Sequence, residues 1–209
     1  MGEVLIHTAK ASQFITLSRE QYSQRGTAQQ LSDSVRRALT LRGDIAFVAE
    51  PAPTPPDVAP MVGLYNASDI VEGDEVSTSL DSLVDLIAQL QRNKAIPSRI
   101  LLDPLGWAEF RKLRIGTAYN QSLLGAGTED AAQLLLSLPV LVNIALDAYT
   151  GLVVDKNAVI AAVGNVQVAT SEHAAFQSDA IAVRATWRFG HAVVRPERIG
   201  KFTIAQPGS

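Results

Sequence analysis

The stretch that decides the fold runs from Leu138 to Ile204: LPVLVNIALDAYTGLVVDKNAVIAAVGNVQVATSEHAAFQSDAIAVRATWRFGHAVVRPERIGKFTI. Near its end, apolar and polar residues alternate, with Ile181, Val183, Ala185, Trp187 and Phe189 on one side and Ala182, Arg184, Thr186 and Arg188 on the other. A period of two predicts a half-buried strand. Unbroken to Val194, this strand would be roughly two to three times the usual length, so Gly190 is predicted to mark a bulge or turn.

Composition sets limits on the class of protein. The chain has 209 residues, of which 47% are hydrophobic, which is enough for one large or two small domains. A formal charge of -3 argues against a dedicated nucleic-acid-binding protein, and the lack of cysteine excludes disulfides and thiolate metal sites. No run approaches the roughly 18 apolar residues of a membrane span. The opening MGEVLIHTAK has no signal-peptide core, so we expect an intracellular protein.

A long helix is predicted over residues 28–49. Its apolar stripe consists of Leu31, Val35, Ala38, Leu39, Ile45 and Ala49. Gly43 predicts a bend or break within it. Before the helix, residues 3–9 resemble a short strand, and Ser18 is placed to cap a short helix. After it, the proline-rich PAPTPPDVAP predicts an extended connector.

Two further segments contain helices. TSLDSLVDLIAQLQRNK predicts a helix with Thr78 and Asp81 spaced as a capping box, and with a core face of Leu80, Leu83, Val84, Ile87 and Leu90. SRILLDPLGWAEFRKLRIG predicts a buried strand followed by a helix, with Asp103 as N-cap, Pro104 in the first turn and Gly116 at the stop. Residues 116–137 are expected to form a mobile loop, with Gly125 and Gly127, before a short helix.

The residues that carry chemistry do not cluster in the sequence. His7, His173 and His191 lack metal-ligand spacing, and there is no G-x-S-x-G motif. The pair of Gly125 and Gly127 lacks the third glycine of a dinucleotide loop. Trp107 and Trp187 are interpreted as core anchors rather than ligand platforms. We therefore predict no catalytic, cofactor or metal site, and no enzyme activity.

Taken in order, the segments resemble a known family. The matching pieces are ITLSREQYSQ, the long helix ending before a proline-rich turn, GLYN at 63–66, LLDPLGWAEFRKL at 101–113, LPVLVNIAL at 138–146, GLVVDKNAVIAAVGNVQVATSE at 151–172 and FQSDAIAVRATWRFGHAVVRPERIGKF at 176–202. Together they resemble the major capsid proteins of tailed bacteriophages, which have the Hong Kong 97-type fold.

This resemblance implies an α+β fold in three ranges: a peripheral domain over 1–57 with a spine helix, an axial domain over 58–179, and strands at 180–209 that return to the peripheral domain. Relative to the family, the chain lacks the N-terminal arm and most of the E-loop, so no cross-linking residue is carried over. For the same reason the 209-residue form is not expected to close into shells by itself.

The resemblance also implies a function. The chain is expected to be the major capsid protein of a phage or prophage, assembled in the bacterial cytoplasm into an icosahedral shell of pentamers and hexamers. That shell would enclose double-stranded DNA without specific contacts, with scaffold and portal proteins as further partners and no membrane. The alternatives are an encapsulin-type nanocompartment shell and a small α/β enzyme or ligand-binding protein.

Four arginines are candidates for contacts between subunits. Arg36 and Arg37 lie off the apolar stripe of the long helix, and Arg184 and Arg188 lie on one face of the long strand. A guanidinium pairs well with a neighbour's carboxylate because its planar fork donates two parallel hydrogen bonds. The alternative is a solvated polar face or pairing within the chain, since exposed charges contribute little to stability.

Overall fold

A computed structural model describes residues 4–58, 60–116, 119–122 and 133–206. The chain forms two compact units, each built from separate parts of the sequence. The first unit comprises residues 1–62 and 161–192, and the second comprises 63–160 and 193–209. The observed division differs from the expected ranges: residues 161–179 belong with the long helix, and residues 193–209 belong with the central part of the chain.

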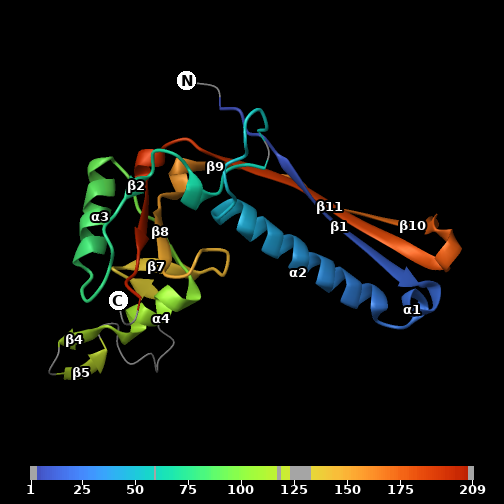
Figure 1. The fold of residues 1–209 in the computed structure, drawn as a ribbon, viewed down its shortest axis with the longest axis horizontal. Coiled ribbons are helices and arrows are strands. Elements are labelled where there is room, and N and C mark those ends of the chain that lie inside the picture. The colour runs from blue at the N-terminus through green and yellow to red at the C-terminus, as the bar shows by residue number, and fades with distance from the viewer. Residues whose placement is uncertain (1–3, 59, 117–118, 123–132, 207–209) are drawn as a thin grey trace. The chain divides into compact units, whose positions relative to one another are not determined.

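The first unit is a long antiparallel sheet with a helix along one face (Figure 1). The sheet order is β1-β11-β10, and β9 also pairs with β11. Pairing of β1 with β11 runs from Ala9 opposite Phe189 to Ser18 opposite Ala180. The elements are β1 (Ala9–Ser18), α1 (Arg19–Ser23), α2 (Thr27–Val48), β9 (Val159–Val163), β10 (Gln167–Ala175) and β11 (Ala180–Val193), with a 3-10 turn at Phe176–Ser178.

The α2 helix packs on the sheet through small and apolar residues. Val35 and Leu39 are buried against Ala185 of β11, and Ala46 packs with Phe189 in a second cluster. The predicted helix is confirmed within a residue at each end, but it continues without a break through Gly43. That glycine is buried, and a Cβ there would lie 2.6 Å from the Trp187 ring. Close packing, not a bend, explains this glycine.

β11 is unbroken across all 14 of its residues, so the bulge or turn predicted at Gly190 is wrong. Gly190 is needed because another segment passes close by: a Cβ would lie 2.5 Å from the carbonyl oxygen of His7. That segment is not the strand expected at residues 3–9, because β1 begins only at Ala9. The cap at Ser18 is confirmed, since its hydroxyl accepts from the Gln21 N–H at 3.2 Å.

The second unit is built on a six-stranded mixed sheet in the order β2-β12-β8-β3-β7-β6. β8 pairs antiparallel with β12 and β3, whereas β3 pairs parallel with β7. The strands are β2 (Val71–Glu72), β3 (Arg99–Leu102), β6 (Leu134–Leu135), β7 (Leu138–Val142), β8 (Thr150–Val154) and β12 (Ile199–Thr203), with a separate pair β4 (Arg114–Gly116) and β5 (Tyr119–Ser122).

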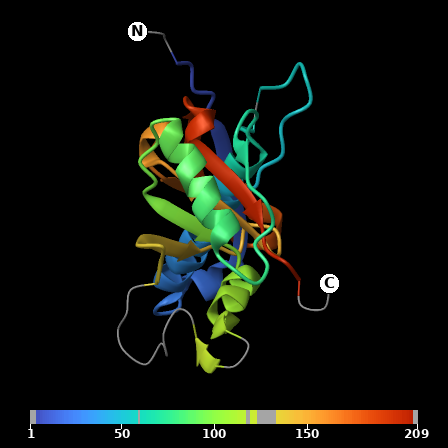
Figure 2. The same ribbon diagram turned by 90° about the vertical axis from the view of Figure 1, so that its left-hand side faces the viewer.

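Two helices complete this unit: α3 (Asp81–Arg92) and α4 (Pro104–Lys112). Figure 2 shows α3 running along the sheet beside β12. Short 3-10 turns occur at Leu64–Asn66, Lys156–Ala158 and Pro196–Arg198. The core joins α3, α4 and the sheet through Leu83, Leu86, Leu90, Ile100, Leu102, Phe110, Val153 and Phe202.

Capping and stop signals in the sequence predicted the helix ends of this unit only in part. Asp103 caps α4 as predicted, accepting from the N–H groups of Leu105 and Gly106 at 2.9 Å. The helix ends at Lys112, before Gly116, which lies in β4. The capping box predicted for α3 is wrong, because its N-cap is Leu80 and no side chain caps it. The loop expected around Gly125 and Gly127 lies outside the described residues.

The core face predicted for α3 is wrong at one position. Val84 is 47% exposed, whereas Leu86 is buried. A helix has 3.6 residues per turn, so Leu86 lies on the same face as Leu83 and Leu90, and Val84 lies nearer the opposite side.

Candidate interaction surfaces

In the described ranges, no group of three or more His, Asp or Glu side chains is arranged to hold a metal ion. Nor is any helix there long and apolar enough to cross a bilayer. His191 is the only one of the three histidines that is buried.

The first unit has a sheet face that turns away from α2. Residues of β1 and β11 that pack with the helix are odd-numbered, such as Ala11, Ile15 and Ala185. The even-numbered residues therefore point to the other side. The side chains of Lys10, Arg184 and Arg188 are exposed there. We call this surface the outer sheet face.

The outer sheet face has one sign of charge. Lys10 is paired in register with Arg188, and Phe14 with Arg184. The other outward positions of β1, β11 and the regularly paired part of β10 hold no carboxylate; they are Ser12, Thr16, Ser18, Ala180, Ala182, Thr186, Gly190, Ala192, Gln167, Ala169 and Ser171. Like charges directly opposite each other destabilise a sheet. The pairing of Lys10 with Arg188 is therefore not explained by the stability of this sheet.

None of these three cations forms an ion pair with a residue that the structure describes. The nearest acids along the sheet have a different partner. Arg19 lies 3.2 Å from Asp179 and 3.5 Å from Glu172, and the interactions with these carboxylates raise the pKa of its guanidinium. These acids are therefore not available to balance the outer sheet face.

Arg36 and Arg37 lie elsewhere. Both are exposed on α2, and Arg36 borders a groove of about 390 Å³ between α2 and β10. The groove is lined mainly by apolar side chains, among them Leu31, Val35 and Val168. The structure thus divides the four arginines into two pairs on opposite sides of the sheet.

The two tryptophans each belong to a different unit. The Trp187 ring lies against Gly43 and 4.3 Å from the Phe189 ring, and its indole N–H donates to the carbonyl of Gly164 at 2.9 Å. Trp107 packs against the core of the second unit and is partly buried. Both rings lie at the edge of a core, and both have packing roles.

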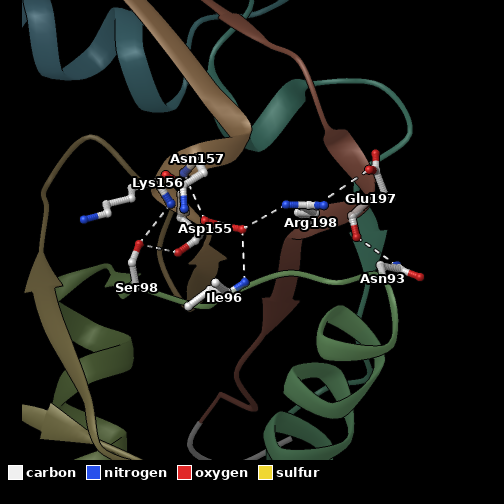
Figure 3. A network of polar contacts seen from close by, with 9 residues as sticks. Asn93, Ile96, Ser98, Asp155, Lys156, Asn157, Glu197 and Arg198 are labelled. Atoms are coloured by element: carbon white, nitrogen blue, oxygen red, sulfur yellow. Dashed lines mark hydrogen bonds and ion pairs between the residues drawn. The ribbon is translucent and has the colours of Figure 1, made fainter.

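Asp155 is the centre of a buried polar network in the second unit (Figure 3). Its carboxylate is 0% exposed and accepts from the N–H groups of Ile96 at 3.0 Å and Asn157 at 2.9 Å. The guanidinium of Arg198 lies 3.8 Å away. Burial by itself raises the pKa of Asp155, but the two backbone donors and the charge of Arg198 outweigh it, so the pKa lies below its ordinary value.

Hydrogen bonds of the same network connect the segments around Asp155. Ser98 accepts from the Lys156 N–H at 3.0 Å and donates to the Val154 carbonyl at 2.8 Å. On the other side, the amide of Asn93 donates to the Glu197 carbonyl at 2.8 Å (Figure 3). The network joins the ends of α3, β8 and β12. Its geometry is that of a structural clamp.

His191 is a buried ionisable side chain of the first unit. It is 6% exposed, and its ring meets that of Phe47 edge-on at 4.8 Å. Burial lowers its pKa, and a hydrogen bond to the backbone of Val62 opposes this in part. Its Nε2 atom is buried and has no hydrogen-bond partner among the described residues.

A sequence profile described as the phage capsid family matches residues 57–204, which is more than half of the chain. The chain belongs to the phage capsid family. It is a structural major capsid protein. The match favours a phage shell over the nanocompartment and enzyme alternatives. Curated protein sequences contain no significant match.

Solved structures support the same fold for this capsid protein. A structure from Gordonia phage Cozz has a TM-score of 0.75 at 13% identity, covering 96% of this chain and 71% of the other. Mycobacterium phage Ogopogo gives 0.70 at 16% identity, covering 96% and 76%. The capsid of an empty GTA particle gives 0.78 at 15% identity, covering 96% and 74%. The Hong Kong 97-type α+β fold is thereby confirmed.

Sequence reasoning about this capsid protein missed two features. Phe14 is 62% exposed on the outer sheet face, and Lys10 adds a third cation to it. A partial signal was present, because the positions between Lys10 and Thr16 alternate in polarity except at Gln13 and Phe14. The Asp155 network had no such signal, since its members are far apart in the sequence.

Proposed function

We propose that this major capsid protein is the repeating subunit of an icosahedral shell that encloses double-stranded DNA in the virion of a tailed phage or prophage. The observation that carries the proposal is the family match over residues 57–204. A similar fold forms the capsid of a GTA particle described with C5 symmetry, which supports assembly of this chain into symmetric rings. Assembly takes place in the bacterial cytoplasm, with scaffold and portal proteins as further partners.

Such a shell works through repetition. Each contact between subunits is modest, but symmetry closes many of them at once. Rim charges select partner and register more than they add affinity. This is the role that we assign to Arg36, Arg37, Arg184 and Arg188, which are exposed on two sides of one sheet. Enclosed DNA makes sparse, non-specific contacts, since the chain carries a net charge of -3.

A structural, non-enzymatic role fits the buried carboxylates. Asp103 caps a helix and Asp155 holds backbone N–H groups, so both are occupied by the fold. The groove beside α2 is lined mainly by apolar side chains, with Arg36 at its border, and has no convergent set of acids and bases.

Particles purified from an induced host that carries this gene test the proposal. We expect mass spectrometry to find this polypeptide as the most abundant component, electron microscopy to show closed shells, and nuclease treatment to leave protected double-stranded DNA. Shells that contain enzyme cargo and no DNA would contradict the proposal. So would particles that lack this polypeptide.

A further inference from the structure

The outer sheet face combines an exposed aromatic ring with cations that form no ion pair among the described residues. Phe14 is 62% exposed and lies opposite Arg184, while Lys10 and Arg188 form the second outward pair along the same two strands, beyond Ser12 and Thr186. Phe14 lies four positions after Lys10, about 13 Å along a strand. Aromatic and arginine side chains are the residues most enriched at the energetic centres of protein interfaces. Such a face is suited to an acidic surface that also presents an apolar group.

The second unit presents a surface of this complementary kind. Asp81, Val84, Asp85 and Ala88 are all exposed on α3. Their spacing of three, four and seven residues places them on one stripe, opposite the stripe that is buried in the core. Val84 is 47% exposed between the two carboxylates. We call this stripe the acidic α3 face.

Over the first two turns of α3 and the segment before it, charge is also one-sided, and Arg92 follows one turn after Ala88. The sequence has no lysine or arginine between Arg42 and Arg92, whereas acids recur throughout. Asp74 and Glu75 are exposed on the segment that reaches α3, where the Ser82 hydroxyl donates to the Glu75 carbonyl at 3.1 Å. Asp85 makes no ion pair within the described part of the chain.

We propose that the outer sheet face of one copy docks on the acidic α3 face of a second copy. Lys10, Arg184 and Arg188 meet the carboxylates of Asp81 and Asp85, and Phe14 packs against Val84. The contact deepens the proposed shell function, on which it rests, by naming the two surfaces that meet. Because the two surfaces differ, the contact is head-to-tail, and repetition generates a ring where the rotation closes.

The test is a charge swap measured by sedimentation velocity on the purified 209-residue chain. R184E/R188E reverses the outer sheet face and D81K/D85K reverses the acidic α3 face. Wild-type association is expected to weaken as salt rises, because salt screens exposed charges. Each reversed variant alone is expected to associate about 10- to 100-fold more weakly. An equal mixture of the two is expected to regain association, because each reversed surface then finds its complement.

Matched variants separate this contact from general charge and folding effects. R99E/R195E changes the net charge as much as R184E/R188E does, at exposed positions outside both faces, and is expected to leave association unchanged. Lysine near the start of α3 opposes the helix dipole. The neutral D81N/D85N variant, checked by circular dichroism, therefore repeats the test without that effect. F14S is expected to weaken association without a change in charge, with I144S as the control at another exposed apolar residue.

Several outcomes would overturn the proposal. They are a wild-type chain that stays monomeric at low salt up to its solubility limit, reversed variants that associate normally, and a mixture that fails to regain association. The last result would place any contact inside one chain. In a fourth outcome, duplex DNA binds wild type but not R184E/R188E, while the two proteins self-associate equally. That result would assign the cations to binding nucleic acid. Each leaves the particle test of the shell function untouched, so the two failures are distinguishable.

Discussion

Asp155 and His191 show opposite ways of burying an ionisable side chain. The carboxylate of Asp155 is surrounded by backbone N–H donors and a guanidinium, so its charged form is favoured despite burial. The imidazole of His191 has an aromatic neighbour and one backbone partner, so its neutral form is favoured. Both pKa values therefore lie below their ordinary values, with different consequences for stability.

We expect D155N to lower the free energy of unfolding at pH 7 by about 1–3 kcal/mol, because a charged acceptor for two backbone donors is lost. The folded pKa of Asp155 is depressed, so its contribution is present above the ordinary value of about 3.9 and is lost as the pH falls through the folded value. Urea unfolding at pH 7 and near pH 3 should show the difference shrinking. The control is D179N, at an exposed carboxylate.

His191 should make stability depend on pH in a higher range. The folded state binds its proton less readily than the unfolded state, so the free energy of unfolding falls as the pH drops below about 6.5 and levels off below the folded pKa. We expect H191L to remove this slope. Urea unfolding from pH 8 to 5 measures it, with H173Q as an exposed control. An unchanged slope in H191L would contradict the prediction.

At the scale of elements, sequence periodicity predicted the long helix and the long strand. It failed at positions where a tertiary contact determines the residue type. α2 and β11 were found from sequence because many residues repeat one pattern. The predicted bend at Gly43 and bulge at Gly190 are wrong, because a residue distant in sequence packs against each glycine. That residue is Trp187 for Gly43 and His7 for Gly190. The capping box of α3 failed because residue spacing alone does not determine which side chain reaches the helix terminus.

The outer sheet face could be predicted only in part. Alternation placed Arg184 and Arg188 together on one side of a strand, but the pairing with Lys10 and Phe14 depends on the register of β1 with β11. Sequence alone does not reveal that register, because the two strands are separated by most of the chain. The same limit hid the separation of Arg36 and Arg37 from the other arginines.

The close contact of α2 with Trp187 predicts the effect of a small substitution. G43A should gain helix propensity of about 1 kcal/mol. It should nevertheless destabilise the protein by about 1–3 kcal/mol overall, because the new methyl overlaps the indole ring. Thermal unfolding of G43A, W187F and the double variant measures this. The cost should shrink in the W187F background, and S34A, at an exposed α2 position, should not be destabilising.

At the scale of the whole molecule, each unit has its own core. The first is centred on α2 and β11 and the second on α3, α4 and the mixed sheet. The chain has two tryptophans, and each unit contains one. Fluorescence can therefore follow the units separately.

We expect core truncations to act on one unit at a time. L90A should lower the midpoint reported by Trp107 in a W187F background, and L39A should lower that reported by Trp187 in a W107F background. Each should cost about 2–5 kcal/mol, because both side chains are buried. Urea titration followed by fluorescence measures the midpoints. Each truncation is also made in the other background, where a shift of the same size would show that the units unfold as one.

The pairing of β1 with β11 has a consequence for biosynthesis. Ser18 lies opposite Ala180 and Ala9 opposite Phe189, so β1 pairs with a strand that is synthesised 162 to 180 residues later. At roughly 5–20 residues per second, translation of the intervening chain takes about 8–36 s. Until then α2 has no sheet to cover it, and the surface bearing Lys10 and Arg188 does not yet exist. On the proposed docking, an unfinished polypeptide on a polysome lacks this surface, so we expect only chains synthesised through β11 to join a growing particle.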